Sequence, residues 1–168
     1  MFHASHWSLV ALAIACGFGL AACAGTEFGG PSTATPTMVT PTGPTPAPPR
    51  IAAQELIGRW GYAAFHRPED RPRIETKAQG QCGTPYVITA SSGGSITMLG
   101  HDNPNPQEMT TKGTVEGKTY VGPPGDPAGS DDREIVSFDG RVLVLKWVST
   151  EVAGRYGTMV LVRCGPRA

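Results

Sequence analysis

The sequence predicts a mainly β protein whose domain is a small eight-stranded antiparallel up-and-down barrel with one short helix. Three observations predict this fold class. Glycine (22) and proline (16) together exceed a fifth of the 168 residues, whereas charged residues make up 17%, a composition typical of loop-rich β proteins. Short segments with strand character follow one another across hairpin-length turns. The closing segments are the most apolar, and Val142-Leu143-Val144-Leu145 is continuous rather than alternating, as expected of a strand that is covered on both faces.

The expected elements of the domain begin at residue 51. A short helical lead-in covers 51–57, and a first strand covers 59–65. The polar segment 69–79 has Pro72 near its start and Gly80 where a cap would lie, which predicts a short surface helix. We expect this helix or the lead-in to cover the outer face of the closing strands.

Seven further strands complete the predicted meander. Asp139-Gly140, between the sixth strand and the seventh, is a strong hairpin signal. Closure of the meander removes its exposed edges and therefore favours a barrel; an open sandwich of the same strands is the alternative. The seven predicted strands are 85–90, 95–100, 107–114, 118–121, 133–138, 141–148 and 157–164.

The amino-terminal region carries a targeting signal. Residues 8–22 form an uncharged apolar run of the length found in secretory signals, rather short for a membrane span. The run ends at Leu20-Ala21-Ala22-Cys23, which resembles the lipobox of bacterial lipoproteins. The resemblance implies that the signal peptide, residues 1–22, is removed and that Cys23 is lipidated on its thiol and on its new amine. Several acyl chains, at about 0.8 kcal/mol per buried methylene, hold a protein on a bilayer.

The resemblance also implies a location. Ala24 follows the cysteine, whereas lipoproteins retained in the inner membrane carry Asp there, so we expect an outer-membrane lipid anchor with the domain in the periplasm. Residues 1–7 contain His3 and His6 but none of the Lys or Arg usual in such signals. Two alternatives stay open: an ordinary signal peptide whose cleavage releases a soluble secreted protein, and a retained anchor helix.

A linker is predicted between the lipid and the domain. Residues 23–50 include seven prolines and six threonines between Pro31 and Pro49, and such a segment buries too little apolar surface to offset its ordering entropy. We expect a disordered, extended spacer that reaches up to about 60–80 Å from the membrane. The alternatives for its threonines are glycosylation or contact with the cell wall. The domain then covers residues 51–168.

The cysteines predict a disulfide. Cys16 lies in the signal peptide and Cys23 in the lipobox, which leaves Cys82 and Cys164 as an even pair in an oxidising compartment. Cys82 precedes the second predicted strand and Cys164 ends the eighth, and both of these strands pair with the first in a closed meander. A bond between them would therefore span the seam of the barrel.

A second resemblance concerns the start of the first strand. Gly58-Arg59-Trp60 is similar to the Gly-x-Trp opening of lipocalin-like and avidin-like barrels. In lipocalins this Trp closes the barrel floor and is often packed by an Arg from the far end of the chain, for which Arg163 is the candidate. Inward-facing Trp60 and Tyr62 would either belong to a filled core or line a cavity for one small ligand.

The order of lipobox, Pro-rich stalk and small β domain resembles that of outer-membrane lipoproteins of alphaproteobacteria. Some of those carry a barrel related to bacterial protease inhibitors, which implies inhibition of an envelope protease or lysozyme as one function. The inhibitors place their two cysteines close together, whereas Cys82 and Cys164 are far apart in this chain.

Catalytic and metal-binding motifs are not found. No serine lies in a G-x-S-x-G elbow, and His66 and His101 stand singly in turns beside acidic residues. We expect no enzyme, no cofactor and no metal. The acidic loop 121–134 does not match the EF-hand spacing, and we expect Asp132 to pair with Arg133. Loops of this kind often bind partners, so the predicted partner loop comprises Asp126, Asp131, Asp132 and Arg133.

The charge balance limits the functions further. The chain has 14 basic and 14 acidic residues, so it lacks the basic surface from which nucleic-acid binding draws its affinity. We expect a non-enzymatic binding or scaffold role in the cell envelope, with an envelope protein or the cell wall as partner. The alternatives are a lipocalin-like carrier of a small apolar ligand and the inhibitor. Small or polar inward residues would favour the carrier, and a filled core would favour the scaffold.

Overall fold

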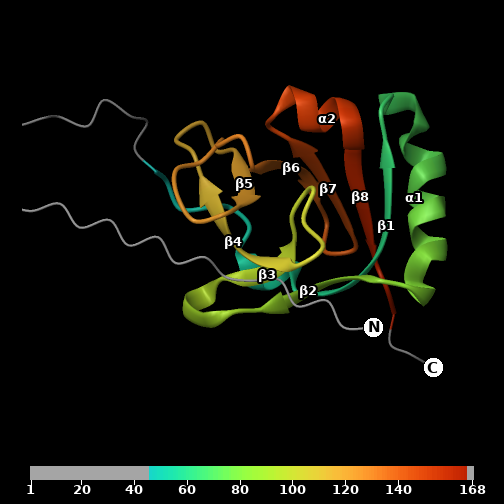
Figure 1. The fold of residues 1–168 in the computed structure, drawn as a ribbon, viewed down its shortest axis with the longest axis horizontal. Coiled ribbons are helices and arrows are strands. Elements are labelled where there is room, and N and C mark those ends of the chain that lie inside the picture. The colour runs from blue at the N-terminus through green and yellow to red at the C-terminus, as the bar shows by residue number, and fades with distance from the viewer. Residues whose placement is uncertain (1–45, 166–168) are drawn as a thin grey trace, which may run out of the picture. The chain divides into compact units, whose positions relative to one another are not determined.

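The computed structural model describes residues 46–165. Within it, eight antiparallel strands pair each with the next, and the last pairs with the first, so that the sheet closes into a barrel (Figure 1). The predicted fold class is confirmed, and the open sandwich is wrong. The predicted signal peptide, the predicted lipobox and most of the predicted linker lie outside the described residues. The strands are β1 (Gly58–Phe65), β2 (Tyr86–Ala90), β3 (Ile96–Leu99), β4 (Pro106–Gly113), β5 (Thr119–Gly122), β6 (Arg133–Phe138), β7 (Val142–Trp147) and β8 (Thr158–Arg163).

Two α-helices accompany the barrel. Helix α1 (Arg71–Gln79) is the predicted surface helix, and a 3₁₀ turn, Ala53–Leu56, forms the predicted lead-in. Helix α2 (Thr150–Tyr156) lies between β7 and β8, where the sequence analysis assigns no element. Neither helix in residues 46–165 is long and apolar enough to cross a bilayer.

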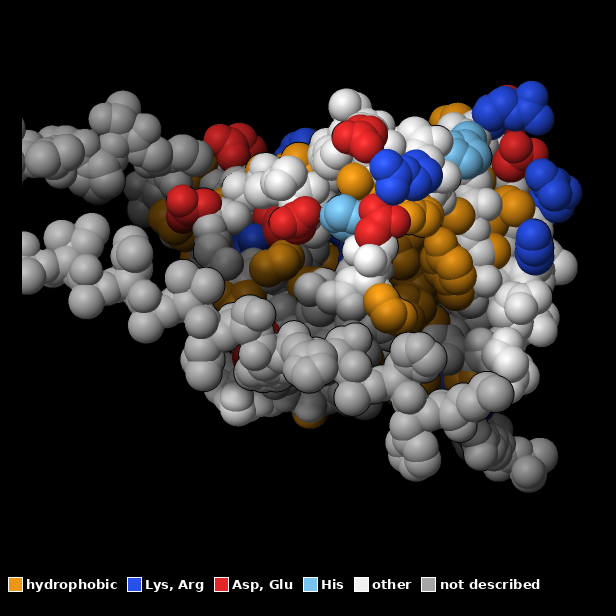
Figure 2. Space-filling view, in the orientation of Figure 1, with side chains coloured by type: hydrophobic (Ala, Val, Ile, Leu, Met, Phe, Trp, Pro, Cys, Tyr) orange, Lys and Arg blue, Asp and Glu red, His pale blue; other side chains and the backbone are white. Residues whose placement is uncertain are grey.

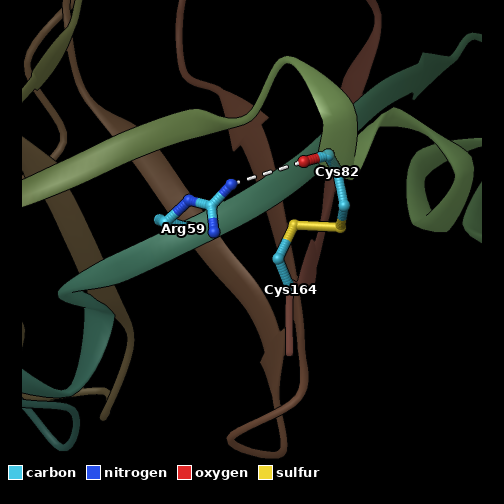
Figure 3. The surroundings of a disulfide bond; sticks show 3 residues. All are labelled: Arg59, Cys82 and Cys164. Atoms are coloured by element: carbon cyan, nitrogen blue, oxygen red, sulfur yellow. Dashed lines mark hydrogen bonds between the residues drawn. A yellow bond between two sulfur atoms is a disulfide. The ribbon is translucent and has the colours of Figure 1, made fainter. Parts of the chain in front are cut away.

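The barrel closes along β1 and β8. These strands pair over six residues, from Trp60 opposite Arg163 to Phe65 opposite Thr158. The structure joins Cys82 to Cys164 beside this seam, with their Cα atoms 5.7 Å apart (Figure 3), which confirms the predicted disulfide. The backbone N–H of Cys164 also donates to the carbonyl of Arg59 at 2.9 Å. The bond therefore ties the segment after α1 to the end of the last strand.

Helix α1 covers the outer face of the closing strands. Its Ile74 and Ala78 pack against Ala63 of β1 and against Val160 and Val162 of β8, and Figure 1 shows the helix alongside β1. A side chain on Gly61 would clash with the carbonyl of Ala78, so this close approach requires a glycine. This second covered face explains why β8 is apolar on both faces, and Val142 at the start of β7 packs against the same cluster.

The last residues of the predicted linker contact the barrel. The N–H of Ala47 donates to the carbonyl of Gly113 at 3.2 Å, and the N–H of Arg50 donates to the hydroxyl of Thr119 at 3.2 Å. Contacts with the barrel thus begin before residue 51, at Ala47. All eight strands, the disulfide and both helices lie in residues 46–165, so a chain that starts at residue 24 keeps every contact of the barrel within that described part.

The interior of the barrel is largely filled by its own side chains. One continuous cluster of buried apolar residues runs through it and includes the lead-in turn. Members that are at most 2% exposed come from the lead-in turn and from seven strands: Leu56, Trp60, Ile88, Ile96, Met98, Met109, Val121, Leu143, Leu145 and Leu161. A deep ligand cavity is therefore absent from the part of the barrel that these residues fill.

Candidate functional site

One end of the barrel is closed by Trp60 and Arg163. Trp60 is fully buried, and its indole Nε1 donates to the carbonyl of Leu56 at 2.9 Å. The guanidinium carbon of Arg163 lies 4.2 Å from the centre of the Trp60 ring. All three Arg163 nitrogens donate to backbone carbonyls, those of Gly140 (2.7 Å), Ile57 (2.9 Å) and Glu55 (2.8 Å). Trp60 is thus the floor of the barrel, as the lipocalin resemblance implies, and does not line a cavity.

The opposite end is open and holds a depression of about 270 Å³. Tyr62 belongs to its wall: this side chain comes from β1 on the same face as Trp60, two residues further along, and remains 37% exposed. Of the two residues predicted to line a cavity, only Tyr62 does so. The other walls come from β2, β3, β7, α2 and β8 and from the loop after β3, and the side chains are Tyr86, Leu99, His101, Asp102, Trp147, Tyr156 and Met159.

Charged side chains from two loops and helix α2 meet at the rim of the depression. His101 lies between Asp102, at 3.3 Å from its Nδ1, and Asp131, at 3.2 Å from its Nε2. Asp102 also accepts from Arg155 at 2.9 Å and from the hydroxyl of Tyr156. On the face drawn in Figure 2, a hydrophobic area borders a histidine and side chains of both charges. The rim therefore joins the β3–β4 loop to the β5–β6 loop and to α2.

The rim lowers the pKa of the Asp102 carboxyl. The hydrogen bond from Tyr156 is the largest cause, followed by the contact with His101, and the charge of Arg155 acts in the same direction. The carboxylate is thus the form that the rim favours.

Helix α2 delivers two of the rim residues, Arg155 and Tyr156. The Ser149 hydroxyl accepts from the N–H of Val152 at 3.3 Å and caps the start of the helix. Gly157 ends it with a positive φ of 72°, which a glycine adopts without strain. A serine and a glycine seven residues beyond the helix start are ordinary helix boundary signals, and reading them together would have predicted α2.

Arg133 of β6 lies beneath the depression and is 1% exposed. Its guanidinium carbon is 4.1 Å from the centre of the Trp147 ring, and its Nη2 donates to the carbonyl of Leu99 at 2.7 Å. Its Nε and Nη1 atoms are buried and have no hydrogen-bond partner. A positive charge therefore stands close to the aromatic wall.

Burial changes the pKa values of the groups around this charge. It raises the pKa of Tyr62 and of Tyr86, while the positive charge of Arg133 opposes the rise. Burial also lowers the pKa of Arg133, although a guanidinium keeps its proton in proteins. Both phenols are therefore neutral at physiological pH, and the charge of Arg133 is not balanced by a phenolate.

The predicted pairing of Asp132 with Arg133 is wrong. Asp132 directly precedes Arg133, the first residue of β6. Consecutive residues of extended backbone point to opposite faces, so Arg133 enters the barrel while Asp132 points outward to Lys112. The Lys112 ammonium is 2.6 Å from the Asp132 carboxylate and also donates to the carbonyls of Pro123 (2.9 Å) and Asp126 (3.0 Å). The Lys112 ammonium thus already binds the oxygens that a metal ion would use in this loop.

The residues of the predicted partner loop do not form one site. Asp126 and Asp131 are exposed, and Asp131 belongs to the rim, whereas Asp132 and Arg133 are buried in different surroundings. Among residues 46–165, no three His, Cys, Asp or Glu side chains gather as metal ligands would. His66 follows the end of β1 and lines a separate surface hollow, apart from His101. The aromatic depression, with its charged rim and the buried Arg133, is the strongest candidate site in the described domain.

Comparison with models of protein families, with curated proteins and with solved structures finds no match to this chain.

Proposed function

We propose that this chain is a lipid-anchored binding protein of the bacterial cell envelope, without enzymatic activity, and that it binds a small ligand at the open end of its barrel. The observation that carries the proposal is the difference between the two ends. Trp60 and Arg163 seal one end, whereas the other keeps a depression with three tyrosines and a tryptophan in its wall. Aromatic walls with a few polar groups are characteristic of ligand sites.

The filled interior limits what can bind. Ligand pockets usually measure about 300–1,000 Å³, and the depression, at about 270 Å³, is slightly smaller than that range. A long acyl chain would need the space that the core side chains occupy. The ligand is therefore compact, with a few rings at most, and part of it stays at the mouth.

The anchor is proposed from the lipobox. Cys23 would hold the domain at the outer membrane, with the binding end in the periplasm. Radiolabelled palmitate should be incorporated into the full chain in a bacterial host and not into Cys23→Ser. Equal labelling of the two would overturn the lipid anchor and leave the binding site untouched.

The binding proposal can be tested with a neutral aromatic dye, N-phenyl-1-naphthylamine, whose fluorescence rises in apolar sites. Residues 24–168 would be secreted to a periplasm, so that the disulfide forms without a lipid. Tyr62→Ala removes one aromatic wall and should weaken dye binding about 10-fold. Val136→Ala is the matched control, because Val136 is 51% exposed and does not line the depression. Absence of saturable binding to the unmodified domain, both for this dye and for its sulfonated counterpart, would overturn the proposal.

Recognition of an envelope protein or of the cell wall is the second candidate function. The filled core favours it, since such a surface module needs no cavity. In that case the dye would not bind saturably, and the exposed Asp126 and Asp131 would be the first positions to substitute in a search for the partner surface.

A further inference from the structure

The barrel contains two arginine–tryptophan pairs, one at each end, and only one of them is fully bonded. At the closed end, every guanidinium nitrogen of Arg163 donates to a carbonyl. At the open end, Arg133 lies equally close to Trp147, but only its Nη2 has a partner, and its Nε and Nη1 have none. Arg163 therefore shows the full set of hydrogen bonds that a purely structural arginine makes in this fold, and the hydrogen bonds of Arg133 can be compared with it.

The charge of Arg133 is also unbalanced. The adjacent carboxylate, Asp132, is engaged by Lys112 at 2.6 Å on the outer side of the sheet. Within residues 46–165, Arg133 takes part in no ion pair, and its contact with the Trp147 face offsets a cation only in part. A buried charge without a partner is costly, and proteins retain such groups mostly where function needs them.

The unbalanced charge lies next to the depression. Two of the residues in contact with Arg133 also line the depression: Trp147 through its ring and Leu99 through its carbonyl. The same carbonyl accepts from the hydroxyl of Tyr86, a third lining residue, at 2.8 Å. Arg133 is 1% exposed, so the field of its guanidinium reaches the depression through protein side chains, where it is screened much less than on the surface.

We infer that the ligand of this site is a small organic anion, a carboxylate or sulfonate on a planar apolar body, held by the charge of Arg133. The inference rests on the proposed function, which it makes more specific. The rings of the ligand would stack among Tyr62, Tyr156 and Trp147, and its acid group would lie over Arg133. A shift of the guanidinium toward the depression would let its free N–H groups donate to the acid oxygens.

Two dyes with the same aromatic body separate this inference from the proposed function. 1-Anilinonaphthalene-8-sulfonate carries a permanent negative charge, and N-phenyl-1-naphthylamine is its neutral counterpart. Hydrophobicity alone would favour the neutral dye. With Arg133 beneath the site, residues 24–168 should bind the sulfonate about 10- to 100-fold more tightly. Equal affinities, or a preference for the neutral dye, would overturn the anion inference and leave the binding site standing. Failure of both dyes to bind would overturn both.

Substitution of Arg133 tests whether its charge causes the preference for the sulfonate dye over the neutral dye. Arg133→Met should abolish the preference for the sulfonate and change the affinity of the neutral dye less than about threefold, whereas Arg133→Lys should keep most of the preference. Arg141→Gln removes the same charge from the hairpin at the closed end, and it should leave both affinities unchanged. A preference that survives in Arg133→Met would overturn the inference.

Thermal unfolding provides a readout that distinguishes a ligand-binding role from a structural one. Arg133→Met should melt at the same temperature as the unmodified domain or higher, because an apolar side chain replaces an unpaired buried cation. Arg163→Met, which loses three hydrogen bonds, should melt lower. If Arg133→Met melted much lower or failed to fold, the ratio of the two dye affinities in the unmodified domain would still decide the question.

Discussion

The disulfide is expected to supply a large part of the stability of this barrel. Cys82 and Cys164 are separated by 82 residues, and in the chain-entropy model the closure of such a loop stabilises the folded state by about 4.5 kcal/mol. Single domains are stable by about 5–15 kcal/mol in all. Both cysteines are only half-buried, so few native contacts disappear with them. The double substitution Cys82→Ala/Cys164→Ala should therefore lower the free energy of unfolding by about 4 kcal/mol.

Urea unfolding of residues 24–168, followed by tryptophan fluorescence, measures this change. The slope of the free energy against urea should increase, because the denatured chain without the bond is more expanded and exposes more surface. The melting temperature should fall by ~10–20 °C. The unmodified domain in a thiol reductant is the control, and it should match the double variant. A loss below about 1 kcal/mol, with an unchanged slope, would refute the entropic argument.

Three further predictions follow from single contacts. Lys112→Met should lower the free energy of unfolding by about 3–5 kcal/mol, because it leaves the buried Asp132 carboxylate without its cation; a urea midpoint equal to that of the unmodified domain would contradict this. Ser149→Ala should lower the free energy of unfolding by about 1 kcal/mol through loss of the α2 cap. Ser149→Thr keeps a hydroxyl at this position and should lower the free energy of unfolding much less. Asp102 has a pKa lowered from 3.8. Its contribution to the free energy of unfolding should therefore be complete above about pH 5 and should disappear as the pH falls through the lowered pKa. The stability difference between the unmodified domain and Asp102→Asn, measured from pH 2 to pH 7, should follow that course, and a pH-independent difference would contradict it.

Local signals were sufficient to predict most of the fold. Each strand begins and ends within one residue of its predicted position, because strand character and turn residues are properties of short segments. The disulfide followed from the number of cysteines and the expected compartment. The floor followed from Gly58-Arg59-Trp60 together with a distant arginine, and the structure places Arg163 on Trp60.

The errors have identifiable causes. Helix α2 was not predicted, because it has only seven residues and its boundary signals, Ser149 and Gly157, indicate a helix only when they are taken together. The pairing of Asp132 with Arg133 was predicted from adjacency in the sequence, although adjacent strand residues face opposite sides of a sheet. Lys112, the actual partner of Asp132, lies 20 residues away, and only the pairing of β4 with β5 and of β5 with β6 brings the two together.

The sequence by itself determined the number and order of the strands, the cysteine pair and the closed end, because each depends on composition, on local patterning or on a short motif. Only the tertiary structure decided which end is open and which charge is left unpaired. The depression takes its walls from β1, β2, β3, β7, β8, α2 and the loop after β3, segments that meet only when the barrel closes. Whether Arg133 has partners depends on every group packed around it in the folded chain, and no local pattern in the sequence encodes that.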